Sequence, residues 1–136
     1  MNVEDVEQSL PDGFHDAKLC RIDVDFARAT CTLEFRVDYE EGEKVVSLTL
    51  TGLALCSVEP PFPEARYVPL DAQGTRVDGF PTSEEVFPSL KAYADLLPAG
   101  CFFYSFYLTS TNSFIHVAAS SAALAIREGG GDNEPT

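Results

Sequence analysis

The sequence has little positive charge: nine Lys and Arg stand against 22 Asp and Glu, which gives a formal net charge of −13. Such a surface repels nucleic-acid backbones and anionic membranes, so we expect neither as a partner. A basic protein is the partner that this charge favours, because electrostatic attraction speeds its association. The acidity is equally consistent with a role in solubility alone.

Long apolar runs are also absent. No stretch approaches the roughly 20 apolar residues that a transmembrane helix needs. The first ten residues, MNVEDVEQSL, are acidic and lack the apolar segment of a signal peptide. We therefore expect a cytoplasmic protein that does not associate with a membrane.

Motifs of enzymes and metal sites are missing as well. The chain contains no GxSxG, HExxH, Walker loop or GxGxxG, and its four cysteines form no CxxC or CxxxC pair. Cys20, Cys31, Cys56 and Cys101 lie in apolar, strand-like stretches, as free buried thiols often do. The sequence thus predicts a non-catalytic protein with no cofactor and no bound metal.

A two-residue periodicity is present instead. Residues 17–26 and 30–39 alternate between apolar and polar positions, which is typical of strands with one buried face. The link FARA suits a hairpin turn in which Asp25 pairs with Thr30. In that register Cys20 lies on the apolar face, opposite Phe35. Residues 46–51 and the aromatic segment CFFYSFYL continue the strand pattern, and the latter is apolar on both faces.

The remaining segments complete a meander of strands with one helix. Residues 82–97 predict the only substantial helix, with Pro88 limiting where it begins. The proline-rich stretch 57–83 is long for a loop and has room for a small edge hairpin around DAQG. We expect one domain over residues 1–127 and a disordered acidic tail over 128–136. The fold class is α+β or mostly β: a twisted antiparallel sheet, open or curled into a half-barrel, with one principal helix.

His15 and Asp16 adjoin each other at the start of the first long strand, within LPDGFHDAKL. Successive strand residues point to opposite faces, so we expect no catalytic pairing between them. In a structural role, Asp16 accepts backbone N–H groups of the turn and His15 bonds to a neighbouring strand. A metal site or hydrolase that also used His116 would require the last strands to fold back beside the first.

Two further groups are candidates for binding. Aromatic side chains in the late strand, together with the second histidine, are a candidate ligand pocket or else part of the core; they are Phe102, Tyr104, Phe106 and His116. Carboxylates around the EEGE turn are a candidate surface for a basic protein, or else a solvated edge that discourages aggregation; they are Glu34, Asp38, Glu40, Glu41 and Glu43.

The stretch Phe14, His15, Asp16, Ala17, followed about thirty residues later by LTLTGL, resembles a family of polymorphic-toxin immunity proteins. Members of that family carry Phe-His-Asp-Ala-Glu-Val and then a strand that ends near Phe-x-Gly. Here Lys18 replaces the glutamate, Leu50 replaces the phenylalanine, and the C-terminal half has no counterpart. The resemblance implies a non-catalytic protein that blocks a toxin by binding it. The alternative is a small-ligand-binding domain that uses the aromatic pocket.

Overall fold

The computed structural model describes residues 3–58, 75–82, 87–109 and 113–128. Most of these residues are in strands. The strands are β1 (Pro11–Phe14), β2 (Ala17–Asp25), β3 (Thr30–Tyr39), β4 (Gly42–Thr51), β5 (Leu55–Val58), β6 (Thr75–Thr82), β7 (Phe102–Leu108), β8 (Ser113–Ala119) and β9 (Ser121–Glu128). The helices are α1 (Val3–Gln8), the 3₁₀ turn η1 (Pro88–Leu90) and α2 (Lys91–Ala94).

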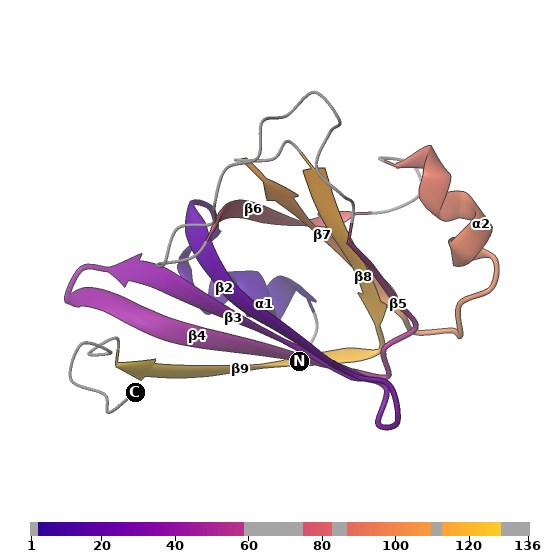
Figure 1. Cartoon of the computed structure of the whole chain (residues 1–136), viewed down its shortest axis with the longest axis horizontal. Coiled ribbons are helices and arrows are strands. Elements are labelled where there is room, and N and C mark those ends of the chain that lie inside the picture. The colour runs from indigo at the N-terminus through magenta and orange to yellow at the C-terminus, as the bar shows by residue number, and fades with distance from the viewer. Residues whose placement is uncertain (1–2, 59–74, 83–86, 110–112, 129–136) are drawn as a thin grey trace.

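Eight of the strands form one antiparallel sheet in the order β5-β8-β7-β6-β2-β3-β4-β9. The strands at the two ends of this order continue strands that lie within it: β5 follows β4 after residues 52–54, and β9 follows β8 after Ser120. The bent segment β4–β5 stays paired with the bent segment β8–β9 on both sides of the bend, through the pairs β4–β9 and β5–β8. Between these two pairs, the Ser120 N–H donates to the Thr51 carbonyl at 3.0 Å. The sheet therefore curls into a barrel-like ring (Figure 1).

The interior of the ring is a single aromatic and aliphatic core. Phe14 lies at its centre, with ring centroids 4.6 Å from Phe35, 5.5 Å from Phe106 and 6.0 Å from Tyr104. Helix α1 lies across the ring in Figure 1 and adds Val6 to the same core. Burial of these rings is the main source of the fold's stability.

A second, smaller cluster covers the outer face of β7 and β8. Leu90 of η1 packs there against Phe103 and Ala118, with Leu55 of β5 at the margin. Strand β7 is thus covered on both faces, and it is a central strand between β6 and β8. Both features agree with the two-sided apolar pattern of CFFYSFYL.

The expected β2–β3 hairpin is confirmed near its turn and wrong at its far end. Asp25 pairs with Thr30, as predicted. A β-bulge at Cys20 then shifts the register, so that Leu19 rather than Cys20 lies opposite Phe35. The bulge turns Cys20 outward and buries Leu19 in the core.

Two other expectations need correction. The described part of the predicted helix is only the turn at Pro88–Leu90 and the single α-helical turn Lys91–Ala94. Proline at the first position fits, because its fixed φ suits the start of a helix. Strand β6 is not an edge strand, because it pairs with both β2 and β7. The other arm of the expected hairpin, and residues 129–136 of the expected tail, lie outside the described residues.

None of the helices within the described ranges has the length and apolar character needed to cross a membrane.

Candidate functional site

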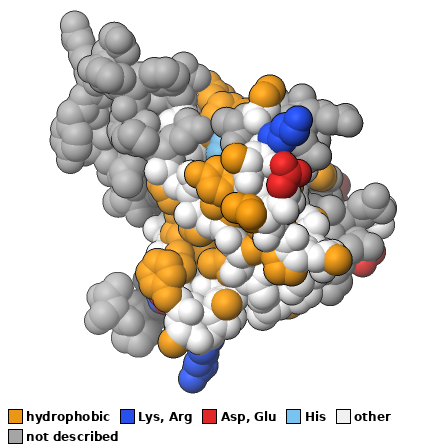
Figure 2. Space-filling model, turned by 90° about the vertical axis from the view of Figure 1, so that its right-hand side faces the viewer, with side chains coloured by type: hydrophobic (Ala, Val, Ile, Leu, Met, Phe, Trp, Pro, Cys, Tyr) orange, Lys and Arg blue, Asp and Glu red, His pale blue; other side chains and the backbone are white. Residues whose placement is uncertain are grey.

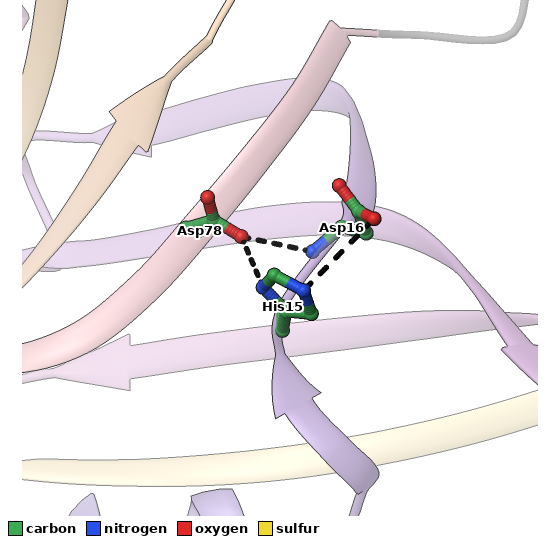
Figure 3. A group of neighbouring side chains, drawn as sticks. All are labelled: His15, Asp16 and Asp78. Atoms are coloured by element: carbon green, nitrogen blue, oxygen red, sulfur yellow. Dashed lines mark hydrogen bonds and ion pairs between the residues drawn. The ribbon is translucent and has the colours of Figure 1, made fainter.

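Three polar side chains meet where the β1–β2 turn approaches β6 (Figure 3). His15 Nδ1 lies 2.7 Å from Asp78 Oδ1, and the backbone N–H of Asp16 donates to the same oxygen at 3.0 Å. His15 Nε2 lies 4.0 Å from Asp16 Oδ2. Asp78 therefore binds the turn through two contacts to one carboxylate oxygen.

The local backbone explains why the two adjacent residues share one side. Asp16 has φ of 57°, a left-handed conformation that aspartate tolerates better than most residues, and it places residues 15 and 16 in a turn. Strand alternation therefore does not apply, and the expectation that His15 and Asp16 point apart is wrong. Asp78 reaches them because Ala17 pairs with Val77 across β2 and β6.

A cation and a shallow hollow border this group. Arg76 Nη1 lies 3.7 Å from Asp16 Oδ1, the oxygen that does not face His15. The hollow next to His15 is open to solvent, and its other lining residues are Gln8, Leu10, Pro11, Gly13, Phe14 and Gly79. The side chains of His15 and Asp16 are 62% and 57% exposed, so solutes have direct access to them.

The expected structural role for the turn is met in part. His15 does bond to the neighbouring strand, but the acceptor of the turn's N–H group is Asp78 and not Asp16. Sequence reasoning missed Asp78, which lies 62 residues from Asp16 along the chain. No local pattern marks it, because only the pairing of β2 with β6 brings it to the turn.

We expect His15→Ala to lower the free energy of unfolding by less than about 1 kcal/mol, because the pair is exposed. Asp78→Ala should cost about 1–2 kcal/mol, since it also removes the acceptor of the Asp16 N–H. Urea denaturation of both variants and wild type measures the difference. Equal losses of unfolding free energy in the two variants would show that the hydrogen bond from the Asp16 N–H to Asp78 adds nothing to stability.

The second histidine is not part of this group. His116 is buried on β8, and its Nδ1 lies 2.6 Å from Ser105 Oγ on β7. Its ring packs against Phe87 at 4.7 Å and Phe114 at 5.6 Å between centroids. Strand β7 separates β8 from β6, so the structure does not join His116 to His15 in one site.

The four candidate pocket residues lie on two faces of the sheet. Tyr104 and Phe106 are buried in the ring interior, and Phe102 packs against the same core. His116 lies on the outer face with Phe114 and Phe87. Tyr104 packs against Phe14, and Phe106 packs against Phe35, within the hydrophobic core.

The candidate acidic residues do come together, on and around the β3–β4 turn. Glu43 Oε1 bonds to Arg36 Nη1 at 3.0 Å, and Glu34 Oε2 lies 3.7 Å from Arg127 Nη2. The other three residues are exposed and form no ion pair with the described part of the chain: Asp38, Glu40 and Glu41. Asp38 also lies directly across from Glu43.

The cysteines are free thiols, and two of them are in contact. The thiol of Cys56 hydrogen-bonds to that of Cys31, and this contact and burial raise the pKa of Cys31. The same hydrogen bond lowers the pKa of Cys56 to about 7. Cys20, exposed by the bulge, differs from the expected buried thiol, and partial burial raises its pKa as well.

Hydrophobic side chains gather on the face that carries α2 (Figure 2). Leu96, which follows α2, is 82% exposed and Tyr93 is 48% exposed. Large contiguous apolar patches often mark binding surfaces, whereas single exposed apolar side chains are normal. Nothing in the described residues indicates what would cover this face.

Comparison of the chain with protein-family models, with characterised proteins and with solved structures gives no match.

Proposed function

We propose that this chain is a non-catalytic protein-binding domain that captures a basic partner protein. An inhibitor of the immunity type is the form that the resemblance of Phe14 to Ala17 suggests. We place it in the cytoplasm and assign it no enzymatic activity. The observation that carries the proposal is a group of three exposed carboxylates at the β3–β4 turn that form no ion pair with any described residue, here called the acidic turn: Asp38, Glu40 and Glu41.

A regular β-hairpin positions the acidic turn. Strands β3 and β4 pair without interruption from Thr30↔Thr51 to Tyr39↔Gly42, so the carboxylates lie at the end of a long hairpin. A fixed charge array loses little conformational freedom on binding. It also attracts an oppositely charged partner before contact, which raises the association rate.

The acidity has a cost for folding that favours a role in binding. Asp38 and Glu43 face each other across the two strands, and like charges in that position are destabilising. Arg36 neutralises Glu43, whereas no cation of the described ranges pairs with Asp38. A purely solubilising surface does not need its charges concentrated at one turn.

We expect the charge reversal Asp38→Lys, Glu40→Lys, Glu41→Lys to weaken partner binding at least roughly tenfold, because repulsion replaces attraction. The measurement is a pull-down with tagged protein from a lysate of the source organism, at low and high salt, quantified by mass spectrometry. Wild type should retain a basic protein at low salt and lose much of it at high salt, since salt screens exposed charges.

A matched control separates the acidic turn from net charge. Asp23→Lys, Asp25→Lys, Asp95→Lys makes the same change in net charge at exposed positions away from the acidic turn. This control should retain more of the partner than the reversal at the turn. Equal retention by wild type and by the turn reversal would contradict the proposed surface.

A further inference from the structure

A second site, independent of the acidic turn, is indicated by the way His15 is held. Asp78 Oδ1 accepts a hydrogen bond from His15 Nδ1, which lies 2.7 Å away. A proton on Nδ1 leaves the lone pair of the neutral imidazole on Nε2. Nε2 faces Asp16 Oδ2 at 4.0 Å, which is too long for a hydrogen bond. A nitrogen and a carboxylate oxygen thus face each other across a gap (Figure 3).

We propose that His15 and Asp16 bind a divalent first-row transition metal ion such as Zn²⁺, with Asp78 as the residue that positions the imidazole. Bonds from Zn²⁺ are about 2.0–2.1 Å long to nitrogen and about 2.0–2.2 Å long to carboxylate oxygen, so these two donors on one ion lie at most about 4.3 Å apart. The observed 4.0 Å falls within this limit. Exposed side chains close the remaining difference from tetrahedral geometry by small rotations.

The contact with Asp78 is the arrangement found behind many metal-binding histidines. A carboxylate that accepts the far N–H fixes the tautomer and the ring orientation, and it makes the ligating nitrogen more basic. Asp78 is itself held by the Asp16 N–H at 3.0 Å. Both ligands and the positioning residue are therefore connected through one carboxylate oxygen. The donor atoms of the three side chains all lie within 4.8 Å of one another.

The surroundings suit an ion with open coordination positions. The shallow hollow beside His15 gives room for water ligands or for a donor from another molecule. One imidazole nitrogen with carboxylate oxygen favours first-row transition ions over Ca²⁺ and Mg²⁺, which prefer oxygen ligands throughout. Arg76 should weaken binding of the ion by charge repulsion, because its guanidinium lies 3.7 Å from the other oxygen of Asp16.

The experiment compares the responses of the two histidines to added Zn²⁺. Zn²⁺ is titrated into the purified full-length protein while NMR follows the imidazole resonances, which distinguish Nδ1 from Nε2. The exposed His15 should shift through Nε2 in a saturable way, and the buried His116 is an internal control that should not move. Because the readout is the imidazole, zinc bound at the cysteines does not imitate the result. Ca²⁺ at the same concentrations should leave His15 unmoved.

The variants test each role. Asp16→Asn, which keeps the left-handed turn accessible, should weaken Zn²⁺ binding at least tenfold, whereas Asp95→Asn at a distant exposed position should not. Asp78→Ala should weaken binding about 10–100-fold, as expected for the loss of a positioning carboxylate. Asp78→Asn should restore much of it, because its amide oxygen still accepts from Nδ1. Arg76→Gln should strengthen binding.

The proposal is overturned if His15 does not shift at millimolar Zn²⁺, or if Asp16→Asn and Asp95→Asn bind alike. It is also overturned if Asp78→Asn is as impaired as Asp78→Ala, because Asp78 would then not act by positioning the ring. None of these results depends on the acidic turn, so the metal site and the partner-binding proposal fail or stand separately.

Discussion

Replacing Phe14 by alanine is expected to lower the free energy of unfolding by about 3–5 kcal/mol, the usual cost of removing a buried aromatic ring. Phe14 is 1% exposed and its ring contacts Phe35, Tyr104 and Phe106 at once. The cavity would lie at the centre of the ring of strands, where the surrounding backbone is paired and has little freedom to collapse. Urea denaturation measures the loss, with a lower midpoint and an unchanged slope.

Phe26→Ala is the matched control for this variant. It removes the same ring from the β2–β3 turn, where Phe26 is 89% exposed, and its effect should stay within about 0.5 kcal/mol. A similar loss in both variants would mean that Phe14 does not have the central place described for it.

The second large effect is expected at Gly79, where a methyl group has no room. A Cβ atom there would lie 2.8 Å from Phe14 Cβ and 2.8 Å from Phe106 Cε1. Gly79 is not among the glycines with positive φ, so space and not backbone conformation is the restriction. Gly79→Ala should therefore lower the free energy of unfolding by about 1–3 kcal/mol, because it overpacks the core.

A double-mutant cycle tests the cause. Phe106→Leu removes one of the two obstructing groups, so the double variant with Gly79→Ala should be less destabilised than the sum of the two single variants. If the losses in unfolding free energy of the two single variants add strictly, the cost of Gly79→Ala has another origin, for example in the pairing of β6 with β7.

The stretch Phe14 to Ala17 divides into a buried pair and an exposed pair. Phe14 and Ala17 are buried in the core, whereas His15 and Asp16 are exposed beside Asp78. Because His15 lies outside the core, the effect of a His15 variant on stability and its effect on the proposed metal binding are measured separately.

Sequence periodicity was reliable where one face of a strand is buried and the pairing is local. The β2–β3 register from Asp25↔Thr30 inward follows from the short FARA link. It failed at Cys20, since a bulge inserts one residue and reverses which side chains point inward. Periodicity carries no signal for that insertion, because either Leu19 or Cys20 is apolar enough for the core.

The sequence by itself determined that this is a protein built on antiparallel strands with a strong excess of acid, because alternation and charge are local properties. It also placed the carboxylates of the acidic turn, since a two-residue connection between paired strands keeps neighbours together. Only the tertiary structure decided that the sheet curls into a ring, through bends at Gly52 and Ser120. It alone brought Asp78 to His15 and moved His116 to another face, because those relations depend on pairing between distant strands.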